Sequence, residues 1–185
     1  PITASITAIG EVSAGNMLRR NGAQIGDVLY MTGGIGNAAL GLKIRQEQLE
    51  FNRFLLDKYL HPQPRLDVGQ QLIGTATACM DISDGLVQDA GHLAKASHVA
   101  LIINASQLTL SREARDVLNV DDSYYKLLLT GGDDYELLFT APLSANDTLI
   151  KLSEQTDITN TAIGTVTEGQ GVSVLDEEGE PITFD

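Results

Sequence analysis

The sequence predicts an α/β (α+β) sandwich, in which a mixed β-sheet packs against flanking helices. Apolar residues make up 43% of the 185 residues and no low-complexity segment interrupts them, so the chain is able to bury a core. Helix and strand patterns alternate through most of the chain, and two adjacent strand patterns near its end suggest a hairpin. Because a hairpin pairs antiparallel strands, we expect a mixed sheet and not a purely parallel one.

The N-terminal segment alternates between apolar and polar side chains, with Ile2, Ala4, Ile6 and Ala8 on one side. This period of two predicts a strand over residues 2–12 with one covered face. The next elements are expected to be a loop with a short helix over residues 13–26 and a strand over residues 27–33.

A glycine-rich turn follows that strand. Residues 34–39 match the dinucleotide-binding pattern Gly-X-Gly-X-X-Ala. We reject this interpretation because residues 47–60 look helical, and no strand ending in an acidic residue follows at the expected distance. The glycines are instead expected to allow a tight turn and the close packing of a helix that runs to about Gln46.

The remaining elements follow from the same two periodicities. Pro62 and Pro64 end the first of the later helices, since proline cannot continue a helix. Helices are expected over residues 49–59, 67–76, 86–96, 111–118, 122–129 and 144–155, the last capped by Ser144 or Asn146. Strands are expected over residues 98–104 and 135–140, in a hairpin of residues 159–168 with 171–175, and near residues 182–184.

The central motif is MDISDGL, residues 80–86, which joins a short apolar strand to the helix over residues 86–96. Ser83 or Asp84 is expected to cap that helix. Free backbone N–H groups at a helix N-terminus favour phosphate oxygens, and the carboxylates of Asp81 and Asp84 suit Mg²⁺. The alternative is an ordinary capped helix that carries two solvated acids.

A second acidic motif is TGGDDYELLFT, residues 130–140. Its two glycines predict a turn, and its aromatic and aliphatic residues predict the strand that follows. Asp133, Asp134 and Glu136 place three carboxylates where the turn leads into that strand.

Composition excludes several classes of partner. The formal net charge of −13 argues against nucleic acid and against an anionic membrane. The same charge repels polyphosphates, so an ATP site in this chain would depend on Mg²⁺. The single cysteine, Cys79, excludes an internal disulfide, and the sequence contains neither a membrane-spanning run nor a signal peptide. We therefore expect a cytoplasmic protein.

Together the two acidic motifs resemble the thiamine-monophosphate kinase family. That family belongs to the ATP-binding superfamily of aminoimidazole-ribonucleotide synthetase, selenophosphate synthetase and the hydrogenase maturation factor. The sequences Arg20-Asn-Gly-Ala23 and Pro62-Gln-Pro-Arg65 agree with it in order and spacing. The resemblance implies a fold similar to the C-terminal domain of aminoimidazole-ribonucleotide synthetase. It also implies that residues 1–14 are the last strand of a largely missing N-terminal ATP-binding domain, and that residues 15–185 form the C-terminal domain.

The resemblance implies a role for five residues. Asp81 and Asp84 would hold Mg²⁺, Arg20 and Ser83 would contact ATP, and Asp133 would contact thiamine monophosphate. The pair Arg19-Arg20 in an acidic protein is also consistent with an anion contact, although two solvated arginines would look the same. The implied reaction converts ATP and thiamine monophosphate to ADP and thiamine diphosphate by direct transfer. No catalytic side chain is assigned, and a homodimer through the N-terminal domain is expected.

Two alternatives stay open. The chain could belong to another ATP-dependent synthetase of the same superfamily, although the spelling of the two acidic motifs argues against this. It could also be a noncatalytic nucleotide-binding module that keeps the fold. The presence of Arg20, Asp81, Ser83, Asp84 and Asp133 argues against the second alternative.

Overall fold

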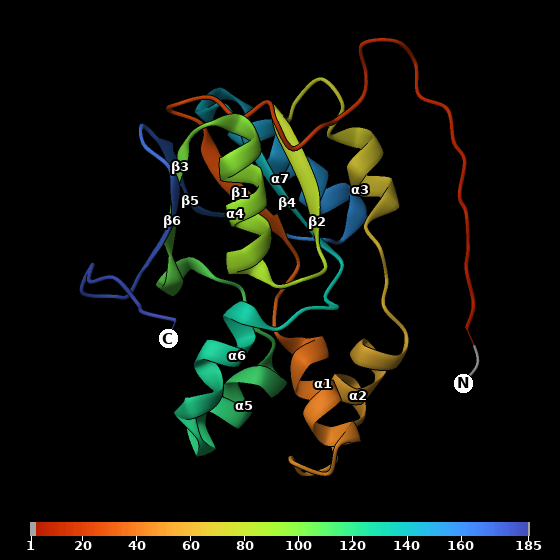
Figure 1. Ribbon diagram of the computed structural model, residues 1–185, viewed down its shortest axis with the longest axis vertical. Helices are drawn as coiled ribbons and strands as arrows, with labels where there is room; N and C mark the ends of the chain where they lie inside the picture. Colours follow the sequence, from red (N-terminus) through yellow and green to blue (C-terminus); the bar gives the residue numbers. More distant parts are fainter. Residues whose placement is uncertain (1–2, 185) are drawn as a thin grey trace.

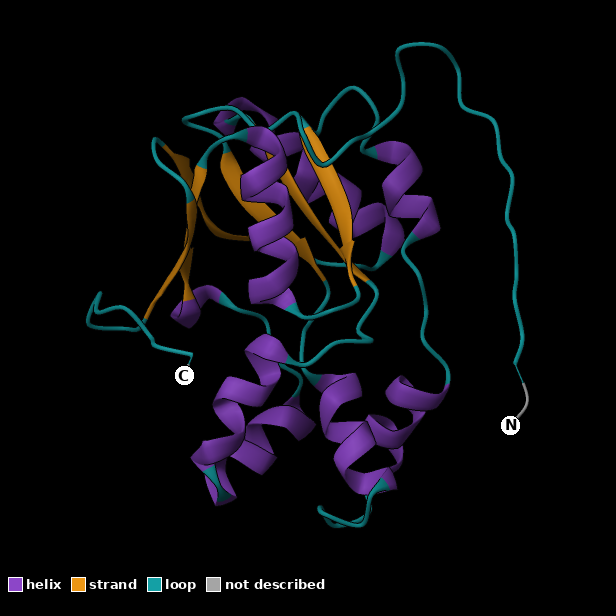
Figure 2. Ribbon diagram, viewed as in Figure 1, coloured by secondary structure: helices purple, strands orange, loops and turns teal. Residues whose placement is uncertain are grey.

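A six-stranded sheet forms the centre of the protein (Figures 1 and 2) in a computed structural model that describes residues 3–184. Its strands lie in the order β2-β4-β1-β5-β3-β6. Every neighbouring pair is antiparallel except β3 with β6, which is parallel, so the predicted mixed sheet is confirmed. The strands are β1 (Val28–Thr32), β2 (Ala78–Ile82), β3 (Ala100–Asn104), β4 (Glu136–Ala141), β5 (Asn160–Thr167) and β6 (Gly171–Leu175).

The predicted hairpin near the C-terminus is wrong. Both of its strands exist, but β3 lies between them, pairing antiparallel with β5 and parallel with β6. The apolar strand β3 satisfies the backbone groups of both neighbours. Local sequence cannot show this arrangement, because β3 comes about sixty residues earlier in the chain. The short strand expected near residues 182–184 is reduced to one isolated bridge between Leu175 and Pro181.

Helices cover both faces of the sheet (Figure 1). Helix α4 (Leu86–Ser97) packs on one face, where Leu86, Ala90 and Leu93 join the largest core cluster. Helices α3 (Leu66–Gln71) and α7 (Asn146–Thr156) pack on the other face, over Tyr30 and Phe139, whose rings stack with centroids 5.4 Å apart. Helix α7 follows the short 3₁₀ turn η3 (Leu143–Ala145) and has no side-chain cap, so the expected capping by Ser144 or Asn146 is wrong.

Four further helices form a lobe beyond one end of the sheet (Figures 1 and 2), hereafter the helical lobe. Its own core contains Leu40, Ile44, Leu55, Ala114 and Leu128. Helix α2 begins later than expected because Asn52 caps it, accepting the N–H of Leu55 at 3.1 Å. The lobe consists of α1 (Asn37–Arg45), α2 (Arg53–Leu60), α5 (Arg112–Val120) and α6 (Tyr125–Thr130), and the short turns η1 (Ala105–Gln107) and η2 (Asp122–Tyr124) lie on its connections.

The N-terminal segment differs from its prediction. Residues 3–27 contain neither strand nor helix, so the expected strand over 2–12 is wrong within the described residues, and Ile2 lies outside them. Ile6 and Ile9 are 93% and 94% exposed. A strand needs a neighbour for its backbone groups, and no strand of residues 3–184 pairs with this segment, which runs away from the sheet (Figure 1).

Candidate functional site

The two acidic motifs lie side by side at the end of β2. The N–H of Asp133 donates to the carbonyl of Ser83 at 3.0 Å, and the N–H of Tyr135 donates to the carbonyl of Ile82 at 2.9 Å. Gly132 makes this contact possible, because a Cβ there would collide with the carbonyl oxygen of Ser83. The structure therefore brings together the two motifs that the sequence separates by about fifty residues.

Three exposed acids surround Tyr135 at this junction. Its hydroxyl donates to Asp133 Oδ1 at 3.4 Å. The negative charge of Asp133 is the largest cause of the raised pKa of Tyr135, followed by partial burial and by the charges of Asp81 and Asp84. Of the five predicted residues, Asp81, Ser83, Asp84 and Asp133 thus share one site. Sequence analysis missed Tyr135, although an aromatic residue between acidic positions was a visible signal.

The expected cap of α4 is wrong. The helix begins at Leu86, and its N-cap is Gly85, with φ 111° and no side-chain cap. The N–H groups of Ser83 and Asp84 instead donate to one carboxylate oxygen of buried Asp89, at 3.0 and 2.9 Å. These two amides, which we expected to face phosphate, are therefore already satisfied within the chain.

Asp89 and His92 extend the acidic site along α4. The ligand atoms of Asp84, Asp89 and His92 lie within 4.8 Å of one another. Burial raises the pKa of Asp89 against the opposing effect of its two amide bonds, and the charges of Asp84 and Asp81 raise it further. Mg²⁺ is commonly held by one or two carboxylates together with substrate oxygens and water. The exposed carboxylates of Asp81 and Asp84 fit that pattern, with Asp89 as a neighbouring oxygen donor.

Arg20 lies apart from the other four predicted residues. Its carbonyl accepts the hydroxyl of Ser97, the last residue of α4, at 3.0 Å. The preceding carbonyl, of Arg19, accepts the N–H of Cys79 near the start of β2. Arg20 is thus at the opposite end of both elements from Ser83, and its exposed side chain makes no ion pair within residues 3–184.

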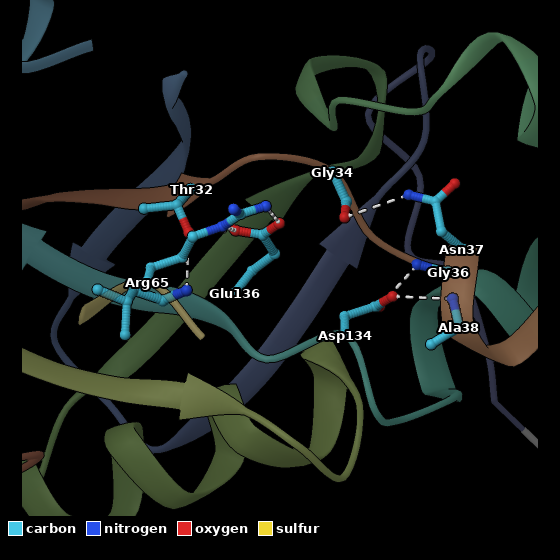
Figure 3. A network of polar contacts seen from close by, with 9 residues as sticks. Thr32, Gly34, Gly36, Asn37, Ala38, Arg65, Asp134 and Glu136 are labelled. Atoms are coloured by element: carbon cyan, nitrogen blue, oxygen red, sulfur yellow. Dashed lines mark hydrogen bonds and ion pairs between the residues drawn. The ribbon is translucent and has the colours of Figure 1, made fainter. Parts of the chain in front are cut away.

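A nearly buried ion pair joins Arg65 to Glu136 of the second motif (Figure 3). Arg65 donates from Nε and Nη2 to the two carboxylate oxygens of Glu136, at 2.7 and 2.5 Å. The hydroxyl of Thr32 donates to Glu136 Oε2 at 2.6 Å and accepts the N–H of Leu137 at 2.8 Å. The Arg65 and Glu136 side chains are only 15% and 5% exposed. Sequence analysis used both motifs for the resemblance but did not predict this pairing.

The carboxylate of Asp134 binds the start of helix α1 (Figure 3). Its carboxylate accepts the N–H of Gly36 at 2.7 Å and that of Ala38 at 3.2 Å, satisfying two orphan donors of the helix. Burial raises the pKa of Asp134 to about 7, against the opposing effect of these two hydrogen bonds. The second motif therefore alternates, with Asp133 directed to the acidic site and Asp134 to the helical lobe.

Residues 24–177 match the family described as AIR synthase related protein, C-terminal domain. The chain belongs to this family, which agrees with the superfamily inferred from residues 80–86 and 130–140.

Several relatives are more specific. The chain is 34% identical over 192 residues to a thiamine-monophosphate kinase of Salmonella typhimurium, covering all of this chain and 58% of that protein. A crystal structure of thiamine-monophosphate kinase from Stenotrophomonas maltophilia K279a superposes with a TM-score of 0.83 at 38% identity, covering 92% of this chain and 56% of that one. A solved complex of AaThiL with AMPPCP and TMP has a TM-score of 0.74 at 34% identity, covering 91% and 52%. The chain thus spans a little more than half the length of these relatives.

Proposed function

We propose that this chain is the C-terminal part of a thiamine-monophosphate kinase, which transfers a phosphoryl group from ATP to thiamine monophosphate. The observation that carries the proposal is the pairing of the two acidic motifs, which brings the loop of Asp81, Ser83 and Asp84 against that of Asp133. The relatives of known name that cover the chain support the choice of substrate, and the AaThiL complex with AMPPCP and TMP supports direct use of a nucleotide.

The site suits phosphoryl transfer because that reaction needs positioning and charge neutralisation more than covalent help. Asp81 and Asp84 would hold Mg²⁺, which neutralises phosphate charge when it is bound. Ser83 lies between them and offers its hydroxyl to a phosphate oxygen. The backbone hydrogen bond to Ser83 holds Asp133 at the mouth of the site. There its carboxylate can accept a hydrogen bond from an amino group of thiamine monophosphate or attract a positive charge of that substrate.

The remaining parts of the proposal concern the whole protein. An N-terminal ATP-binding domain, to which residues 1–14 would belong, would precede residue 15 and would form a homodimer. Arg20 would contact ATP from that side, consistent with its exposed position away from the acidic loops. No helix within residues 3–184 is long and apolar enough to cross a membrane. A cytoplasmic location is part of the proposal, and the net charge of −13 argues against nucleic acid and anionic membranes as partners.

The test is an assay of the whole protein with ATP, Mg²⁺ and thiamine monophosphate, in which thiamine diphosphate is separated and quantified. Formation of thiamine diphosphate that requires both Mg²⁺ and ATP supports the proposal. ATP consumption only with an aminoimidazole-ribonucleotide precursor or with selenide would identify a sister synthetase. Nucleotide binding without turnover of any of these substrates would identify a noncatalytic module.

A further inference from the structure

A cavity separates the end of the sheet from the helical lobe, on the side of the second motif opposite Asp133. Its volume is about 260 Å³, enough for a small organic group, since a single water occupies roughly 10–15 Å³ by the same measure. Four titratable residues line it, namely Lys58, Arg65, Asp134 and Glu136. Lys58 lies outside the proposed kinase site, whereas Arg65 also borders the groove that contains Asp81, without an assigned role there.

The guanidinium of Arg65 has N–H donors that no acceptor within the described part of the chain occupies. A guanidinium carries five N–H donors, and Glu136 takes one from Nε and one from Nη2, which leaves three. Among residues 3–184, no acceptor is found for Nη1. The planar group is held rigidly, because Glu136 is itself fixed by the hydroxyl of Thr32. A rigid guanidinium with its outer edge free is suited to bidentate binding of a carboxylate or phosphate.

Stability alone explains this ion pair poorly. Burying two charges carries a desolvation penalty that their attraction often fails to offset, and apolar replacements of buried pairs are frequently neutral or stabilising. Both side chains are nearly buried here. In a chain with 25 acidic and 12 basic residues, a guanidinium oriented at a cavity wall indicates a role in binding.

The rest of the wall adds positive charge and an apolar surface. Lys58 makes no ion pair within residues 3–184, and its Nζ lies 5.5 Å from the ring centroid of Phe54. Asp134 also lines the cavity, but its carboxylate accepts two amide N–H groups of α1 and, among the described residues, forms no ion pair with Lys58 or Arg65. Phe54 is 40% exposed and lines the same cavity.

We propose that this cavity is a binding site for a small molecule that combines an aromatic or apolar body with a phosphate or carboxylate group. Arg65 receives the anionic group on its free edge, Lys58 adds a second positive charge, and Phe54 contacts the body of the ligand. Glu136 and Thr32 position Arg65, and Glu136 is itself part of the cavity wall. The cavity does not include Asp81, Asp84 or Asp133, although Arg65 also borders the groove that Asp81 lines. The proposal does not depend on the proposed kinase activity.

The test is isothermal titration of the whole protein with phenyl phosphate, benzoate, inorganic phosphate and benzyl alcohol. EDTA is present throughout, so that a Mg²⁺-dependent site does not contribute. We expect saturable binding of phenyl phosphate or benzoate at one site per chain, weaker binding of inorganic phosphate, and none of benzyl alcohol. The aromatic anion with the higher affinity shows whether the site prefers a phosphate or a carboxylate group.

The variants test whether Arg65 binds a ligand or serves only in a structural ion pair with Glu136. Arg65→Met combined with Glu136→Gln removes the guanidinium without leaving a buried lone charge, and should weaken binding about tenfold to a hundredfold. Lys58→Gln, at a partly exposed position that carries no folding risk, should weaken it a few-fold. Asp81→Asn should leave binding unchanged. Absence of saturable binding by the wild-type protein, or equal affinity in Lys58→Gln and in a folded double variant, would overturn the proposal.

Discussion

The acidic side chains of the two motifs differ in what they touch. Asp81, Asp84 and Asp133 are exposed, and their side chains make at most long hydrogen bonds, 3.3 Å from Gln88 to Asp84 and 3.4 Å from Tyr135 to Asp133. Such carboxylates are available to a cation or a substrate. Asp134, in contrast, satisfies two helix amides that would otherwise lack partners. Adjacent residues of one motif therefore serve binding and structure separately.

Asp81→Asn is expected to abolish Mg²⁺-dependent kinase activity of the whole protein and to leave its melting temperature nearly unchanged. The side chain is exposed at the end of β2, so its charge is needed for a hard cation and not for packing. Steady-state assays across a Mg²⁺ titration measure this, with Asp147→Asn, at an exposed position of α7, as the control. Full turnover of the variant at saturating Mg²⁺ would contradict the assignment.

Asp133→Ala should raise KM for thiamine monophosphate about tenfold to a hundredfold, since one charge-assisted hydrogen bond contributes about 1.5–3 kcal/mol. KM for ATP should change little. Asp133 has φ 69°, so Asp133→Asn is the matched variant, because asparagine tolerates this left-handed backbone better than alanine does.

Asp134→Ala is the control for that experiment. It should lower the melting temperature and change both KM values little, because it removes the two hydrogen bonds that join α1 to the second motif. If Asp133→Ala instead raised the Mg²⁺ or ATP requirement alone, Asp133 would belong with the metal ligands.

The pH dependence of stability should carry the signature of Asp134. Its pKa rises to about 7 in the folded protein, above the ordinary value of 3.8, so the folded state holds the proton more tightly than the unfolded state. The resulting stabilisation is fully present below about pH 4 and is lost as the pH rises through 7. Melting temperatures between pH 5 and pH 8 should therefore fall less steeply in Asp134→Asn than in the wild type. Asp89, whose pKa is raised in the same direction, should leave a residual slope in the variant.

At the scale of elements, local sequence patterns predicted the type and approximate position of the helices and strands. Most helices and strands lie close to their expected ranges, because periodicity and breakers act within a few residues. Helix α3, expected over residues 67–76, ends five residues early, at Gln71. The errors concern long-range partners. The insertion of β3 between β5 and β6 and the binding of α1 amides by Asp134 depend on residues that only the fold brings together. The amides of Ser83 and Asp84, in contrast, are taken by Asp89 only six and five residues away. The residues assigned to the acidic site come from the family resemblance and not from local patterns. The Arg65–Glu136 pair joins residues 71 positions apart and was not predicted.

The turn into α1 offers a test of how closely the helical lobe packs. Gly36 has φ 79°, and a Cβ there would meet the side chain of Leu128 in α6 at about 2.5 Å. Gly36→Ala should therefore lower the melting temperature through both backbone strain and steric collision. Gly26→Ala is the control, since Gly26 has φ 92° with no atom within 4 Å of the added Cβ. It should cost only the strain, about 1–2 kcal/mol. Equal losses in urea melts of the two variants would refute the tight packing of α1 on α6.

At the scale of the whole molecule, the acidic site lies on the surface of this domain and not inside it. Asp81 also lines a largely apolar groove together with Met17, Leu66 and Leu137, and Leu66 is 71% exposed. A phosphoryl-transfer site needs to exclude water and to surround the transferred group. In the proposed kinase, the exposed acids of this chain would provide one wall of such a site. The relatives are nearly twice as long, which supports a second wall on the proposed N-terminal domain.

We therefore expect purified residues 1–185 alone to form no thiamine diphosphate from ATP and thiamine monophosphate. Asp81 and Asp84 would still be present, but the other metal ligands and the adenine pocket that the family resemblance places on the N-terminal domain would not. A cooperative thermal transition of the same sample shows that inactivity does not result from unfolding. The whole protein, assayed in parallel, supplies the positive control. Robust ATP-dependent formation of thiamine diphosphate by the isolated residues would mean that the exposed acidic loops suffice for transfer, and the proposed division of the site between two domains would have to be abandoned.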